Sequence, residues 1–69
     1  MRASDTRVQN GKLYYSVRAT ARELSVTANK LREMMGRGDL EWTQFGVNGP
    51  LWIAVESIVS YQRRKETGE

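Results

Sequence analysis

Small apolar residues alternate with charged ones at helical spacing over residues 17–23, directly after a serine. Ser16 is a suitable N-cap, because a serine hydroxyl can accept a hydrogen bond from a backbone N–H of the first helical turn. The next three residues, 24–26, interrupt the pattern before Thr27, which can cap another helix. The pattern therefore predicts a first helix over residues 17–23, followed by a short turn.

The second helix is predicted by a single apolar face. Leu31, Met34 and Met35 fall at i, i+3 and i+4, so they share one side of a helix. Gly38 can adopt the left-handed conformation that ends a helix, and Leu40 can then fold back onto the apolar face. The opposite face carries Ala28, Asn29, Lys30, Arg32 and Glu33.

After this helix the pattern changes to a period of two, which is typical of strands. Residues 40–45 predict one strand and residues 51–53 its return strand. Between them, Asn48-Gly49 favours a tight hairpin, because a type I′ turn needs positive φ at both central residues. Two strands alone are marginal, so residues 13–15 are predicted as a third short strand.

A last helix is predicted over residues 55–64, with an inward face formed by Val55, Ile58, Val59 and Gln62. The sequence therefore predicts one α+β domain over residues 13–64, in the order short strand, helix, helix, strand, strand, helix. Residues 1–12 are interpreted as a flexible N-terminal arm and residues 65–69 as a frayed tail.

Composition removes several classes of function. The chain has 69 residues, no cysteine and no histidine, so we expect no deep catalytic cavity, zinc finger, disulfide framework or imidazole base. No apolar run approaches the roughly 20 residues that cross a bilayer, and the first residues lack the apolar segment of a signal peptide. We expect a cytoplasmic, non-enzymatic protein without a cofactor, a metal or a small-molecule substrate.

Charge is distributed unevenly along the chain, although the net charge is only +3. Residues 1–37 hold eight basic and three acidic side chains, residues 38–62 hold three acidic and no basic ones, and residues 63–69 add +1. We therefore expect a polyanion to bind the first half, where cations can displace counterions from phosphates. The alternative is a basic surface that is simply solvated.

Two helices joined by a three-residue turn are a compact unit for the major groove of DNA. On this interpretation the exposed face of the second helix reads bases through Thr27, Ala28, Asn29, Lys30 and Arg32. Backbone phosphates are expected to contact Ser16, Arg18, Arg22 and Arg37. Glu33 is predicted to form an ion pair with Arg37, four residues later.

The two tryptophans are assigned to different environments. Trp42 is predicted to face the core, because a half-buried strand beside a helical layer commonly holds such a ring. Leu51 and Ile53 should point inward, so strand alternation places Trp52 on the opposite face. An exposed tryptophan often marks a contact surface, and Trp52 is therefore predicted to touch a partner.

An ordered set of short motifs runs along residues 13–64. In order these are Tyr15-Ser16-Val17, Glu23-Leu24, Val26-Thr27, Arg37-Gly38-Asp39-Leu40, the Gly-containing hairpin, Trp52-Ile53 and Tyr61. With these motifs the chain resembles the winged helix-turn-helix excisionases of phages and integrative elements, which share their fold with the MerR-type DNA-binding domain.

The resemblance implies a recombination directionality factor. Such proteins bind double-stranded DNA at an attachment site, bend it, and direct a tyrosine-family integrase toward excision, with neighbouring copies bound side by side. The wing would include Gln44, Asn48 and Gly49. Family members often carry arginine in this region, whereas this chain has none there.

Two other functions stay open on the sequence. A small MerR-like phage transcriptional regulator would use the same helices, although such regulators typically add a dimerisation helix and few residues follow the third helix here. A protein-interaction module would instead use Trp52 and the acidic region of the wing. The dependence of DNA binding on salt concentration separates these functions.

Overall fold

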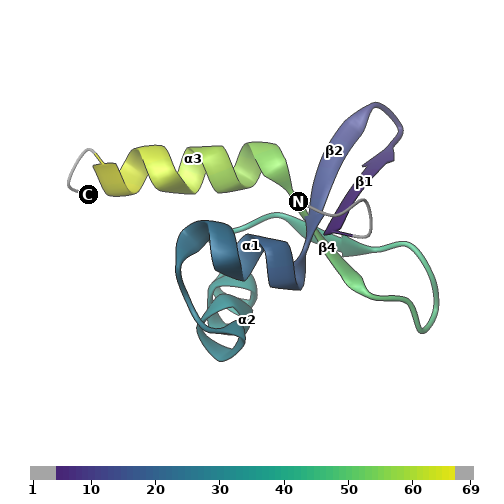
Figure 1. Ribbon diagram of the computed structural model, residues 1–69, viewed down its shortest axis with the longest axis horizontal. Coiled ribbons are helices and arrows are strands. Elements are labelled where there is room, and N and C mark those ends of the chain that lie inside the picture. The colour runs from purple at the N-terminus through teal and green to yellow at the C-terminus, as the bar shows by residue number, and fades with distance from the viewer. Residues whose placement is uncertain (1–4, 67–69) are drawn as a thin grey trace.

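The computed structural model describes residues 5–66, and this part of the chain forms three helices and one four-stranded sheet (Figure 1). In chain order the elements are β1 (Thr6–Gln9), β2 (Lys12–Ser16), α1 (Val17–Leu24), α2 (Ala28–Arg37), β3 (Trp42–Gln44), β4 (Leu51–Ala54) and α3 (Val55–Glu66). The sheet is antiparallel, with strand order β1-β2-β4-β3. The predicted α+β class is confirmed, and β1 is a strand that the sequence did not predict.

Local capping sets where α1 and α2 begin, as the sequence predicted. The Ser16 hydroxyl accepts a hydrogen bond from the backbone N–H of Ala19 at 3.1 Å. The Thr27 hydroxyl accepts one from the N–H of Lys30, also at 3.1 Å. Gly38 ends α2 in the left-handed conformation, with φ of 83°. The boundaries of the two helices therefore follow from short-range chemistry.

The main core lies between the helices and one face of the sheet. Leu31 and Met34 of α2, Ile53 of β4 and Ile58 of α3 are almost completely buried. Leu40 folds back onto this cluster, as predicted. Burying each of these side chains contributes roughly 1.5–3 kcal/mol relative to leaving it in water. The cluster therefore fixes α2 against both the sheet and α3.

The fold begins with a β-hairpin made of β1 and β2, which corrects the prediction of a flexible arm over residues 1–12. The two strands pair as far as Gln9 and Lys12. Asn10 and Gly11 connect them with φ of 53° and 77°, the positive values that a type I′ turn requires. The first four residues of the predicted arm lie outside the described residues.

The predicted tight turn at Asn48-Gly49 is wrong, because neither residue has a positive φ. A wider loop of six residues joins β3 to β4. In this loop the Gly49 N–H donates to the Gly46 carbonyl at 3.2 Å, and Gln44 Nε2 donates to the Gly49 carbonyl at 2.6 Å. Pro50 explains the difference, since a two-residue turn here would use the N–H that proline lacks.

The sheet face opposite the helices carries a second, smaller apolar cluster. Tyr14, Trp52 and Ala54 are buried there, and Phe45 packs against them. The Tyr14 and Phe45 rings meet edge to face, with centroids 5.2 Å apart. Arg7 of β1 lies over this cluster, with its guanidinium carbon 4.6 Å from the Phe45 centroid and 5.8 Å from the Trp52 centroid.

Both tryptophans differ from their predicted environments. Trp52 lies on the face opposite Ile53, as predicted, but it is only 8% exposed because Arg7 and the second cluster cover that face. Trp42 pairs with Ile53 on the helical side, yet it is 45% exposed because β3 is an edge strand. The Trp42 indole N–H donates to the Met35 carbonyl near the end of α2, at 3.3 Å.

Helix α3 packs through a face that the sequence predicted only in part. Ile58 is buried and Tyr61 packs against the core, so these residues, three apart, form the inner stripe. Val59, predicted to face inward, is 43% exposed, since it lies about 100° around the helix from Ile58. The helix extends two residues beyond Arg64, so the frayed tail was predicted too early. Residues 67–69 lie outside the described residues.

Candidate nucleic-acid interface

The turn between α1 and α2 is closed by backbone hydrogen bonds. Ser25 has φ of 56°, and its N–H donates to the Arg22 carbonyl at 3.2 Å. The N–H of Val26 donates to the Ala21 carbonyl at 2.9 Å, and the Val26 side chain packs against the main core. This Schellman-type closure holds α2 in a fixed orientation relative to α1.

Helix α2 has one buried and one exposed face. The buried face consists of Leu31, Met34 and Met35. The residues predicted to read bases are all exposed: Thr27, Ala28, Asn29, Lys30 and Arg32. The structure therefore places these five side chains together on the surface, on and directly before the same helix.

Three of these side chains are available for a ligand. Among the described residues, no ion pair or side-chain hydrogen bond engages Asn29, Lys30 or the guanidinium of Arg32. Asparagine and arginine can each make two hydrogen bonds to one base, adenine and guanine respectively. The Thr27 oxygen already caps the helix, but its hydroxyl proton can still be donated.

The residues predicted to contact phosphate do not share one environment. Arg18 and Arg22 are exposed on α1. The Ser16 hydroxyl is already engaged, because it caps α1 and donates to Asp5 Oδ1 at 3.3 Å. We therefore assign Ser16 a structural role and keep the two arginines as candidate phosphate contacts.

Arg37 is held by Asp39. Its Nη2 lies 3.2 Å from Asp39 Oδ2, and this ion pair replaces the predicted pair with Glu33. The Asp39 carbonyl also accepts a hydrogen bond from Arg64 Nη2 at 3.4 Å. The end of α3 thus approaches the end of α2, which no local sequence pattern indicated.

The β3–β4 loop, predicted as the wing, presents no cation. Val47 is 94% exposed at its tip, next to the exposed Asn48. The Gln44 amide and the Gly49 carbonyl are joined by a hydrogen bond across the loop. Gln44 and Gly49 therefore hold the shape of the loop, and its exposed tip is uncharged.

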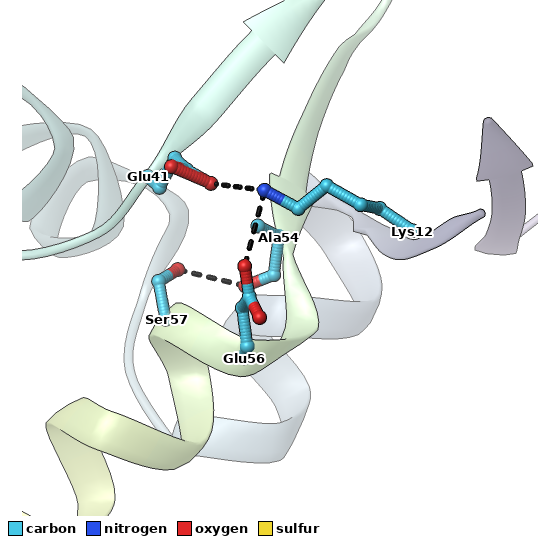
Figure 2. Close-up of polar contacts among 5 residues, drawn as sticks. All are labelled: Lys12, Glu41, Ala54, Glu56 and Ser57. Carbon is cyan, nitrogen blue, oxygen red and sulfur yellow. Dashed lines mark hydrogen bonds and ion pairs between the residues drawn. The ribbon is translucent and has the colours of Figure 1, made fainter. Parts of the chain in front are cut away.

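Lys12 partly neutralises the acidic surface beside β3 and α3 (Figure 2). Its Nζ lies 2.9 Å from Glu41 Oε2 and 3.1 Å from Glu56 Oε1. The hydrogen bond to Glu41, followed by that to Glu56, raises the pKa of Lys12 above its ordinary value. In the same view the Ser57 hydroxyl donates to the Ala54 carbonyl at 2.7 Å. The acidic surface expected around the wing is thus weaker than the sequence suggested.

The exposure predicted for Trp52, on which its partner contact rested, is contradicted by its burial. The Trp52 indole N–H has no hydrogen-bond partner among the described residues. Arg7, which covers the Trp52 ring, was missed because residues 6–9 show no apolar alternation that would predict a strand. Asn10-Gly11 could have predicted this hairpin, because it is the same dipeptide as Asn48-Gly49 in the later loop.

Comparison with known proteins adds no relative: neither a scan of protein-family models nor searches of curated proteins and solved structures found a match. Over residues 5–66, no three His, Cys, Asp or Glu side chains gather into a group that could hold a metal ion. No helix in the described part of the chain is long and apolar enough to cross a membrane.

Proposed function

We propose that this chain is a sequence-specific, double-stranded DNA-binding protein of winged helix-turn-helix type that reads bases through α2. The observation that carries the proposal is the division of α2 into a buried apolar face and an exposed face of unengaged polar and cationic side chains. A helix of this kind fits the major groove, where base edges present distinct donor and acceptor patterns. Arg18 and Arg22, which are exposed on the preceding helix α1, supply phosphate contacts.

Within this class we propose an excisionase. The motifs that resemble the excisionase family occupy the positions that define the helix ends: Ser16 and Thr27 cap the two helices, and Gly38 ends α2. The chain would bind attachment-site DNA, bend it, and position a tyrosine-family integrase and neighbouring copies of itself. No catalytic group is needed here, since strand cleavage belongs to the integrase.

Base reading is tested by comparing Arg32→Ala with Arg18→Ala. A duplex selected from a random pool serves as the specific site, and fluorescence anisotropy gives its affinity and that of unrelated DNA. Arg32→Ala should cost about 1–3 kcal/mol on the selected site and much less on unrelated DNA. Arg18→Ala should weaken binding to both duplexes alike, because a phosphate contact carries no sequence information. Equal losses for Arg32→Ala on both duplexes would remove this residue from base reading.

The excisionase role is tested in a reconstituted recombination reaction. The purified protein is added to a tyrosine-family integrase from the same genome and to its attachment-site DNA, and excised product is measured. We expect product to increase with the wild-type chain and to fall back with Arg32→Ala. Specific DNA binding without any gain in excision would refute the excisionase role and favour the transcriptional regulator.

A further inference from the structure

We propose that the C-terminal turn of α3, together with Arg37, forms a second DNA-backbone contact, which reaches phosphates beyond the segment read by α2. This surface, called the basic edge, consists of Arg37, Arg63, Arg64 and Lys65. This inference rests on the proposed function. It adds Arg63, Arg64 and Lys65 to the DNA interface, three residues that lie in the last turn of α3.

The basic edge is assembled around Asp39. Arg37 contacts the Asp39 carboxylate at 3.2 Å and Arg64 contacts its backbone carbonyl at 3.4 Å, so two guanidinium groups from different helices meet at one residue. Arg64 also lies over the Tyr61 ring, 5.8 Å from its centroid. These contacts orient the two guanidinium groups where the ends of α2 and α3 meet.

Shallow grooves flank Tyr61 at this end of the molecule. One, of about 320 Å³, is lined by Asp39, Tyr61, Arg64 and Lys65. The other, of about 310 Å³, is lined by Tyr61, Gln62 and Lys65 of α3 and by Glu23 and Leu24 at the end of α1. Arg63, Arg64 and Lys65 are all exposed. Three consecutive exposed cations beside these grooves suit a polyanion rather than an apolar ligand.

The dimensions of the molecule favour a DNA backbone as that polyanion. Helix α3 runs along the longest axis, with its C-terminal end at one extreme and the β3–β4 loop at the other (Figure 1). The molecule measures 36 Å along this axis, and one helical turn of DNA spans about 34–36 Å. The basic edge and the loop therefore lie about as far apart as one helical turn of DNA is long. Arg37 links the edge to the phosphate contacts already proposed.

Basic residues at a helix C-terminus also interact favourably with the helix dipole, and this local effect alone predicts a small loss of stability when they are neutralised. It predicts no change in DNA binding. The two roles are therefore separated by measuring thermal unfolding and the salt dependence of binding in the same variants.

The experiment compares the full chain with the variant Arg63→Gln/Arg64→Gln/Lys65→Gln. Anisotropy titrations over a range of salt concentrations use a selected site of about 11 base pairs, one helical turn, and the same site extended by about one further turn. On the long duplex the slope of log affinity against log salt should become shallower by about two to three units, roughly one per lost contact. On the short duplex it should stay at the wild-type value.

Two control variants accompany it. Arg7→Gln removes a cation from the opposite face of the sheet and should leave the slope unchanged on both duplexes. Arg63→Lys/Arg64→Lys, made in the wild-type chain, keeps the positive charges and should therefore keep the wild-type slope. An unchanged slope on the long duplex, or an equal loss on both duplexes, would overturn the inference while leaving DNA binding intact. Failure of the wild-type chain to bind either duplex would instead overturn the proposed function.

Discussion

The two β-hairpins of this protein contain the same dipeptide and turn in different ways. Asn10-Gly11 joins β1 to β2 directly, with positive φ at both residues. Asn48-Gly49 lies in a six-residue loop between β3 and β4, and neither residue has a positive φ. An identical two-residue signal therefore produced a type I′ turn in one place and not in the other.

The residue after the dipeptide accounts for the difference. Lys12 follows Gly11, has a backbone N–H, and pairs with Gln9 across the turn. Pro50 follows Gly49 and has no N–H to close the equivalent pair. An Asn-Gly signal thus depends on a donor at the next position, and it should be interpreted as a hairpin only where that donor exists.

The largest expected effect comes from removing the ring that both hairpins share. Trp52 contacts Arg7 of the first hairpin and lies in one cluster with Phe45 of the second. Trp52→Ala should therefore lower the free energy of unfolding by about 3–5 kcal/mol, measured by urea denaturation followed by circular dichroism. Trp42→Ala is the matched control, and since that ring is half exposed with one hydrogen bond, we expect a loss nearer about 1 kcal/mol.

Trp52→Phe keeps a large ring in the same cluster. Because the buried indole N–H has no hydrogen-bond partner, its removal relieves a desolvation cost of about 1–3 kcal/mol and offsets the smaller ring. Trp52→Phe should therefore be much milder than Trp52→Ala. If the two variants were equally damaging, the N–H would have to be making an important interaction.

An intermediate effect on stability is expected from replacing the glycine in each turn. Gly11→Ala places a Cβ on a residue with φ of 77° and should cost about 1–2 kcal/mol of stability. Gly49→Ala should stay within about 0.5 kcal/mol, because φ is not positive and the new Cβ would meet Gly46 at an ordinary 3.5 Å. Equal losses of stability in thermal denaturation would show that the two glycines meet the same conformational requirement, and that the two turns do not differ in this respect.

The smallest expected effect is a change in the salt dependence of DNA binding, and it tests which of the two hairpins faces DNA. Val47 at the tip of the β3–β4 loop and Val8 on β1 are both exposed, so lysine fits at either position without loss of packing. Val47→Lys should steepen the salt dependence of DNA binding by about one unit, since it adds one phosphate contact. Val8→Lys should leave the slope at its wild-type value. A steeper slope for Val8→Lys alone would assign the wing role to the first hairpin.

Sequence patterns predicted best those features that depend on neighbouring residues. Ser16, Thr27 and Gly38 act within one helical turn, so the ends of α1 and α2 were predicted closely. The spacing of Leu31 and Met34 likewise gave the buried face of α2. The exposed face followed from the same periodicity, which is why the candidate base contacts lie together.

Features that depend on distant parts of the chain were missed. Trp52 is covered by Arg7, which lies on a strand without apolar alternation. No residue near Trp52 in the sequence indicates this contact. The ion pairs of Lys12 join residues 29 and 44 positions away. Arg64 reaches Asp39 only because α3 returns beside the end of α2. Such contacts follow from tertiary packing, which local periodicity does not encode.

The unequal exposure of the two tryptophans gives this protein two distinguishable fluorophores. We expect Trp52, buried beside a guanidinium, to emit at shorter wavelength than Trp42, whose half-exposed indole donates a hydrogen bond to the Met35 carbonyl of α2. A change in the long-wavelength component during a titration therefore follows the end of α2, whereas a change in the short-wavelength component follows the sheet. Ligand binding and unfolding can thus be told apart from the emission spectrum of the unlabelled chain.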